Sequence, residues 1–217
     1  MRIIAHRGAW CADEHLGLKA CDKNSREAFM RATRYGFGIE TDFRDICGKI
    51  VISHNPPSSD AMSAEEFLGL LQPNQIVAVN IKADGLAEEL RRLWTAYAGN
   101  TLPFAFDMSV PDTLGYSKIG FPFFERRSEY EQASVWPDAS GIWLDGFHDI
   151  WFDLAMITSL LEAGKPVCVV SPELHGREYR DLWQTLKTIE IARTEFAGNL
   201  LLCTDNPYEA ERFFAGS

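Results

Sequence analysis

The sequence lacks three features that would assign it to a membrane, nucleic-acid or zinc-binding class. No apolar run approaches the ~18 residues of a membrane-spanning helix, and no signal-peptide pattern precedes the first predicted strand. No Lys/Arg-rich run occurs, and the net charge is −10 with a pI of about 5.0. No Cys-x-x-Cys pair is present to suggest a zinc cluster. We therefore expect no membrane insertion and no nucleic-acid partner.

Cysteine is present but forms no recognisable framework. The chain contains an odd set of five: Cys11, Cys21, Cys47, Cys168 and Cys203. Such a set, without metal-cluster spacing, predicts reduced thiols and a cytoplasmic protein. A disulfide between Cys11 and Cys21, across one loop, is the alternative.

Short apolar segments alternate with helical segments along the whole chain. The first predicted strand ends at His6, and the others span residues 38–44, 76–81, 102–106, 121–125, 141–144, 167–170 and 200–203. About eight helices lie between and after them, including a weak helix or loop at 130–135. Because strands alternating with helices form a parallel sheet covered on its outer face, eight such units predict a closed (β/α)8 TIM barrel. No linker or composition break divides the chain, so we expect one domain over residues 1–217.

Nearly every predicted strand ends in polar or charged side chains. The carboxyl ends of barrel strands form the face that carries the chemistry in such folds. In the first part of the chain this face would hold His6, Arg7, Glu40, Asp42, His54, Asn80 and Lys82.

Glu40 and Asp42 lie two residues apart on one strand, so their side chains share a face. Two neighbouring carboxylates repel unless protons or a cation compensate, and oxygen-bound Mg2+ or Ca2+ would do so. The alternative is a solvated, acidic strand end. His6 and His54 are suited to act as an acid–base pair near neutral pH.

Two basic side chains complete the predicted site. Arg7 offers a planar fork for a phosphate or a carboxylate, or it forms a salt bridge with a neighbouring acid. Lys82 offers a point charge for an anion, or it pairs with Asp84.

These residues carry a resemblance to the glycerophosphodiester phosphodiesterase family. The similar motifs are His6-Arg7-Gly8, Asn24-Ser25 at a helix start, Glu40-x-Asp42, Gly48-x-x-Val51-x-x-His54, Asn80-x-Lys82 and Thr204-Asp205-Asn206-Pro207. Asn24 is the expected helix cap, because Glu27 follows three residues later as in a capping box. The resemblance implies a (β/α)8 barrel that hydrolyses a small-molecule phosphodiester. It implies His6 and His54 as the acid–base pair, Glu40, Asp42 and Asn80 as ligands of a divalent metal, and Arg7 and Lys82 as phosphate-binding residues.

The chain departs from the family pattern at several positions. Asn80 stands where a third metal-binding glutamate is usual, and Lys23 and Asn55 replace a glutamate and an aspartate. The usual insertion after the second histidine is missing, since only residues 55–61 precede the next predicted helix. Glycerol specificity is therefore not carried over, and a sugar or polyol phosphodiester is an alternative substrate. The other readings are a phosphodiester-binding barrel with impaired catalysis and a lyase that releases a cyclic phosphate.

The second half of the chain places further polar residues near the same face. The candidates to line it are Asp107, Arg127, Glu129, Asp145, Glu173 and His175. Trp10, Trp136, Trp143 and Trp151 are candidates for apolar or sugar-stacking walls, whereas Trp94 and Trp183 lie inside predicted helices and are expected in the core. The sequence does not predict the oligomeric state.

Overall fold

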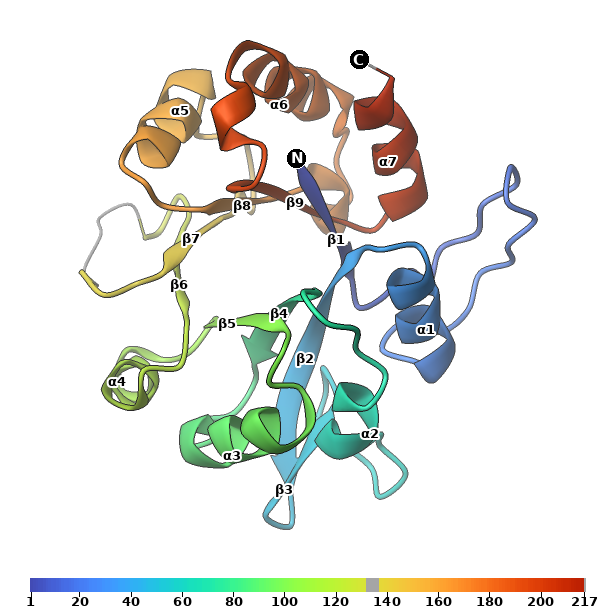
Figure 1. Ribbon diagram of the computed structural model, residues 1–217, viewed down its shortest axis with the longest axis vertical. Helices are drawn as coiled ribbons and strands as arrows, with labels where there is room; N and C mark the ends of the chain where they lie inside the picture. The colour runs from blue at the N-terminus through green and yellow to red at the C-terminus, as the bar shows by residue number, and fades with distance from the viewer. Residues whose placement is uncertain (132–136, 217) are drawn as a thin grey trace.

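A computed structural model describes residues 1–131 and 137–216 of the chain. Its strands form a ring with the helices outside it (Figure 1). The eight parallel strands are β1 (Arg2–His6), β2 (Gly38–Ile46), β4 (Ile76–Ile81), β5 (Leu102–Phe106), β6 (Phe124–Arg127), β7 (Gly141–Leu144), β8 (Val167–Val170) and β9 (Leu200–Thr204). The predicted (β/α)8 TIM barrel is confirmed.

The strands pair in the order β5-β4-β2-β1-β9-β8-β7-β6. Among the residues that the structure describes, one parallel bridge spans the remaining gap between β5 and β6. It joins Ala105 to Phe123, and Ala105 N donates to Pro122 O at 2.9 Å. The ring is therefore nearly closed. A short ninth strand, β3 (Lys49–Ile52), pairs antiparallel with the last residues of β2, 43–46. Of these, residues 44–46 extend beyond the pairing of β2 with β4 in the barrel.

Helices cover the outside of this ring. They are α1 (Arg26–Arg34), α2 (Ala64–Leu68), α3 (Ala87–Tyr97), α4 (Val110–Ile119), α5 (Leu154–Glu162), α6 (Arg180–Ala192) and α7 (Pro207–Ala215). Ser25, Ser63, Ser109 and Asp153 cap α1, α2, α4 and α5 with their side-chain oxygens. None of these helices is long and apolar enough to cross a membrane.

Two sequence predictions about local structure need correction. The first helix is capped by Ser25 rather than Asn24, which has a φ of 55° and lies outside the helix. The predicted strand at 121–125 is displaced to Phe124–Arg127, because Phe123 makes the bridge to β5 and the chain leaves α4 through Gly120 in a left-handed conformation. Most of the predicted weak helix or loop at 130–135 lies outside the described residues.

The hydrophobic core has an inner and an outer layer. Side chains inside the ring form one buried cluster, with Ile4, Ala78, Phe104, Phe106, Phe124, Trp143, Cys168, Val170, Leu201 and Cys203. Their neighbours along each strand pack outward against the helices in two further clusters. Because successive side chains on a strand point to opposite faces, the second residue after an inner-layer residue also faces the ring interior. This alternation selects which side chains reach the centre of the barrel mouth.

Candidate active site

Strand register brings the predicted site residues together at the carboxyl ends of β1, β2 and β4. Ile4 belongs to the inner layer, so His6 faces the interior, and His6 is paired with Glu40 across β1 and β2. Asp42 is paired with Asn80 across β2 and β4. The two pairs therefore stand side by side around one part of the mouth.

A tight turn after β1 allows Arg7 to approach Glu40. Arg7 and Gly8 have φ angles of 56° and 83°, and a Cβ added to Gly8 would lie 2.8 Å from the backbone of Ala28. Only glycine fits such a close approach in this conformation. The turn directs the Arg7 backbone N–H to Glu40 Oε2 at 3.1 Å.

His6 is held by the carboxylate of Asp205, the residue that directly follows the last strand of the barrel. Its Nδ1 lies 2.7 Å from Asp205 Oδ1, and because an ionised carboxylate only accepts hydrogen bonds, Nδ1 carries the proton. The other nitrogen, Nε2, lies 3.8 Å from Glu40 Oε2. Trp10 Nε1 and Lys23 Nζ each donate to Asp205 at 3.2 Å. Burial alone would raise the pKa of Asp205, but His6 and Lys23 hold it below its usual value.

Glu40 and Asp42 are almost inaccessible, with exposed fractions of 1% and 0%. Asn80 Nδ2 donates to Glu40 Oε1 at 3.2 Å, and Arg7 Nε lies 3.1 Å from Asp42 Oδ2. Burial raises the pKa of the Glu40 carboxyl, His6 lowers it, and the neighbouring Asp42 charge raises it again. Positive charge next to these two buried carboxylates would therefore stabilise their ionised forms.

Asn24 is a site residue that the sequence prediction missed. Its Nδ2 donates to Asp42 Oδ2 at 2.9 Å, while its Oδ1 accepts from Thr41 Oγ1 at 2.8 Å. Its left-handed conformation, which asparagine tolerates better than most residues, turns the side chain toward β2. The Asn-Ser pair is the available signal in the sequence, but its position before a helical segment predicts a helix cap.

Lys82 links the first half of the mouth to the second. Its Nζ lies 3.6 Å from Asp42 Oδ1 and 3.9 Å from Asp107 Oδ2, and Arg126 Nη1 donates to Asp107 Oδ1 at 3.0 Å. The predicted alternative pair with Asp84 is not formed, since Asp84 instead accepts from Ser109. Positive and negative side chains therefore alternate across the mouth, in the order Arg7, Asp42, Lys82, Asp107 and Arg126.

The oxygen atoms of Asp42 and Asn80 fit the predicted metal site. Asp42 Oδ1 and Asn80 Oδ1 are buried without a hydrogen-bond partner. Together with Glu40 they offer two carboxylates and an amide oxygen, which are hard ligands suited to Mg2+ or Ca2+. Within residues 1–131 and 137–216, no three His, Cys, Asp or Glu side chains group as a metal cluster. Any ion at this position would therefore depend on the amide oxygen, water or substrate for further ligands.

His54 follows β3 at the rim of the mouth. The side chain is exposed, and its Nδ1 donates to Asn55 Oδ1 at 3.0 Å. The backbone near it is fixed by Ser53 N, which donates to Asp42 O at 2.9 Å. His54 is thus tied to the site through the backbone of β2, and its proton-transfer role stays a prediction.

The candidates in the second half form separate interactions. Arg127 pairs with Glu125, and the Glu129 carboxylate accepts from the backbone N–H groups of residues 147–149. Burial would raise the pKa of Glu129, but those N–H groups lower it to about 2. Glu173, whose pKa is raised by burial, accepts from the hydroxyl groups of Ser171 and Thr204 and from Asp205 N.

A second histidine–carboxylate pair is formed by His175 and Asp145. His175 Nε2 lies 2.8 Å from Asp145 Oδ1. Trp151 Nε1 fixes the backbone of the same aspartate by donating to Asp145 O at 2.7 Å. This pair connects the ends of β7 and β8.

The predicted aromatic walls are mostly used in other ways. Trp143 is an inner-layer residue that stacks on Phe106 with ring centroids 3.8 Å apart, so its prediction as a wall residue is wrong. Trp10 and Trp151 donate hydrogen bonds to site aspartates, and Trp136 lies outside the described residues. Trp94 and Trp183 are buried, as predicted. All five cysteines are free, and the alternative disulfide between Cys11 and Cys21 is not formed.

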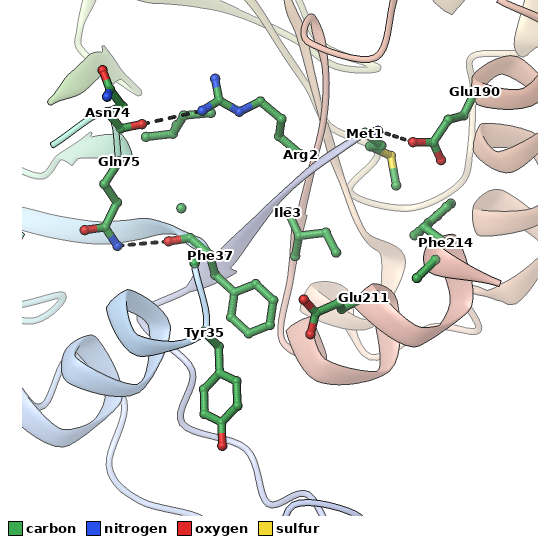
Figure 2. A pocket seen from close by; sticks show the side chains of 14 residues that line it. Met1, Arg2, Ile3, Tyr35, Phe37, Asn74, Gln75, Glu190, Glu211 and Phe214 are labelled. Atoms are coloured by element: carbon green, nitrogen blue, oxygen red, sulfur yellow. Dashed lines mark hydrogen bonds and ion pairs between the residues drawn. The ribbon is translucent and has the colours of Figure 1, made fainter. Parts of the chain in front are cut away.

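A separate cavity of about 390 Å³ opens at the other end of the barrel. Figure 2 shows its lining around the start of β1, with Arg2 directed to the backbone of Asn74 and the Met1 amino group directed to Glu190. It lies at the amino ends of the strands, away from His6 and Glu40. The site defined by the clustered side chains is therefore at the opposite face.

Fold and site together define a (β/α)8 barrel with a histidine, two buried carboxylates and two basic side chains at its mouth. No protein-family model matches the chain, and no curated protein matches it in sequence. A glycerophosphodiester phosphodiesterase from Parabacteroides distasonis has a TM-score of 0.64 at 14% identity, over 99% of this chain and 97% of its own. A glycerophosphodiester phosphodiesterase from Agrobacterium tumefaciens has a TM-score of 0.61 at 16% identity, over 100% and 98%.

A third solved structure, from Silicibacter pomeroyi, has a TM-score of 0.66 at 11% identity, over 100% of this chain and 93% of its own. At these identities the likeness shows a shared fold over the whole chain. The fold implied by the motif resemblance is thus confirmed.

Proposed function

We propose that this protein hydrolyses a small-molecule phosphodiester, with a glycerophosphodiester-like or sugar/polyol-phosphate substrate. The observation that carries the proposal is the clustering of two pairs, His6 with Glu40 and Lys82 with Asp42, at one end of the barrel. The shared fold with glycerophosphodiester phosphodiesterases supports it.

Charge complementarity favours a phosphodiester at this position. Negative charge develops on the non-bridging oxygens of the phosphate as a nucleophile attacks, so fixed positive groups stabilise the transition state. Arg7 and Lys82 carry that charge on either side of Asp42. They would bind the substrate phosphate and orient it beside His6.

His6 is suited to accept the proton of the nucleophile. Its Nδ1 proton is engaged by Asp205, so in the neutral ring Nε2 has a free lone pair. Asp205 also stabilises the imidazolium that forms when Nε2 takes the proton. A second group must then give a proton to the leaving alkoxide. The sequence predicts His6 and His54 as an acid–base pair without saying which is the acid, so with His6 as the base His54 is one candidate for this role.

Glu40, Asp42 and Asn80 would hold a divalent metal ion in this proposal. When bound, Mg2+ or Ca2+ would supply positive charge close to the phosphate oxygens. The buried oxygen atoms of Asp42 and Asn80 that have no hydrogen-bond partner support this assignment. The ion would also relieve the repulsion between the two carboxylates.

The test is hydrolysis of bis(p-nitrophenyl) phosphate and a panel of glycerophosphodiesters and sugar or polyol phosphodiesters, with Mg2+, Ca2+ or EDTA. We expect metal-dependent turnover that His6→Gln abolishes. Turnover that is indifferent to both EDTA and His6→Gln would contradict the proposal. Phosphorus NMR of the products separates hydrolysis from release of a cyclic phosphate. Thermal stabilisation by a diester without any product would instead indicate a binding barrel.

A further inference from the structure

The His175–Asp145 pair faces the same mouth as His6. Trp143 belongs to the inner layer of β7, so Asp145, two residues later, also points to the ring interior, where it is 6% exposed. The same alternation places His6 two residues after Ile4 on β1. The two histidines, each with an aspartate partner, thus stand above the same inner core.

Contacts and electrostatics connect this pair with the metal-ligand candidates. The His175 ring lies 5.3 Å from Phe147, whose face is covered by Arg126 at 5.6 Å. Arg126 is bound to Asp107, which is the residue that Lys82 approaches. Below the mouth, burial raises the pKa of the Cys168 thiol, and the Glu40 and Asp145 carboxylates both raise it further. Cys168 therefore lies within the field of both acids.

The geometry of the pair leaves one nitrogen of His175 for a ligand. An ionised carboxylate only accepts, so Nε2 carries the proton shared with Asp145 and Nδ1 is the remaining nitrogen. The Asp145 backbone is fixed by Trp151, and Arg177 donates to the carbonyl oxygen of Gly146 next to it. The carboxylate that orients the ring is therefore itself held in place by backbone contacts.

We propose that His175, positioned by Asp145, donates the proton to the leaving alkoxide. This inference rests on the proposed phosphodiesterase function. The oxygen of the nucleophile forms a bond to phosphorus, and its proton goes to His6 Nε2. The bond from phosphorus to the leaving oxygen breaks with its electron pair on that oxygen. The imidazolium of His175 then gives its Nδ1 proton to the leaving oxygen, which departs as an alcohol, and solvent restores both histidines.

His54, the alternative donor, has a different setting. Its exposed ring bonds to the amide of Asn55, and no hydrogen bond or ion pair with a carboxylate is found for it among the described residues. His175 is 24% exposed in its side chain and has a carboxylate partner, which is the arrangement that orients a histidine for proton transfer. Substituting each histidine in turn would therefore show which of the two donates the proton.

The experiment uses two diesters of glycerol 3-phosphate that differ in the other alcohol, p-nitrophenol or ethanol. p-Nitrophenolate leaves as a stable anion and needs no proton, whereas ethoxide needs one. We expect His175→Gln to lower kcat for the ethyl ester about 100-fold or more, with a much smaller effect on the p-nitrophenyl ester. Asp145→Asn should show the same selectivity with a smaller loss. His148→Gln, an exposed histidine of the neighbouring loop, is the matched control and should leave both rates unchanged.

The p-nitrophenyl ester also reports whether each variant is folded, because its cleavage does not require the proposed donor. Equal loss of both activities in His175→Gln would overturn the inference, since it would indicate a structural role. Selective loss of the ethyl ester in His54→Gln instead would also overturn it. If the unmodified protein cleaves neither ester nor any diester of the wider panel, the proposed function itself fails.

Discussion

The two halves of the barrel mouth are built differently. In the half formed by β1, β2 and β4, side chains share partners: Asp42 contacts Asn24, Arg7 and Lys82, and Glu40 contacts Asn80 and the backbone of Arg7. In the half formed by β6, β7 and β8, most acids have their own neighbours, as in the Glu125–Arg127 and Asp145–His175 pairs.

This difference separates two tasks. A cluster of shared contacts fixes several charges at once around a single point, which phosphoryl chemistry requires. A residue in a separate pair can be substituted with less effect on the neighbouring pairs. In the proposed function the first half would hold the phosphate and the metal ion, whereas the second half would supply the proton donor and contact the leaving alcohol.

The largest expected effect is from His6→Gln. We expect kcat to fall about 1,000-fold or more on every diester, because the group that accepts the proton is removed. Asp205→Asn should cost less, about 100-fold, because it removes the carboxylate that orients the imidazole and stabilises its charged form but leaves the proton acceptor in place. Steady-state kinetics with the p-nitrophenyl diester would measure both. The control is His15→Gln on an exposed loop, and a comparable loss in that variant would contradict the assignment.

Asn80→Asp tests the charge balance of the first half. A third carboxylate beside Glu40 should raise the affinity for a divalent ion about tenfold, since affinity rises with ligand charge. Without metal, the same substitution should lower the unfolding temperature, because the amide donor to Glu40 Oε1 is lost and a like charge is added. Thermal unfolding in EDTA and in a Ca2+ titration would measure both effects.

The control for this change is Asn74→Asp at the opposite end of the barrel. Asn74 is exposed and has a φ of 63°, a conformation that aspartate also tolerates. The Asn74→Asp substitution adds the same charge away from the site, so the unfolding temperature of this variant should not depend on metal. Equal metal responses of the two variants would argue against an ion at Asn80.

Asp107→Asn tests the link between the halves. Asp107 has a φ of 65°, which asparagine adopts equally well, so the substitution changes charge with little change of backbone. Lys82 and Arg126 would lose their shared carboxylate, and we expect the free energy of unfolding to fall by about 1–2 kcal/mol. Urea unfolding at pH 7 measures this, with the exposed Asp22→Asn as a control that should be near neutral.

Glu129→Gln should give the smallest effect, confined to a defined pH range. The folded-state pKa of Glu129 is lowered to about 2 by the backbone N–H groups of residues 147–149, despite partial burial. Its stabilising contribution is therefore fully present above the unfolded-state pKa of about 4.5 and is lost as the pH falls toward about 2.

The difference in unfolding free energy between wild type and Glu129→Gln should thus be largest at pH 7 and shrink between pH 4 and pH 2. Urea unfolding at several pH values would measure it, with Glu14→Gln on an exposed loop as the control. A difference that grows at low pH would have the wrong sign for this explanation.

Much of the fold followed from local patterns in the sequence. Apolar segments such as Ile76–Ile81 and Val167–Val170 are buried strands within the predicted bounds. The pattern is less informative at β6, where Phe123 bridges to Ala105 and the strand begins three residues later and ends two residues later than predicted. Such a shift depends on a partner strand that a local pattern does not contain.

The site was predicted in part. Residues spaced by two on one strand, such as Glu40 and Asp42, share a face for a reason that the sequence alone contains. The sequence predicts Asn24 as a helix cap, whereas its side chain forms hydrogen bonds with Thr41 and Asp42. A loop residue with a positive φ has no periodic pattern that would reveal its direction.

The sequence by itself determined the barrel, the set of polar residues at its strand ends and the type of chemistry they suggest. Only the tertiary structure decided which of them meet: His6 with Asp205, Lys82 with Asp42 and Asp107, and His175 with Asp145. The reason is physical. Alternation along a strand is a local property of the backbone, whereas contact between residues as distant as His6 and Asp205 depends on the register and closure of the whole ring.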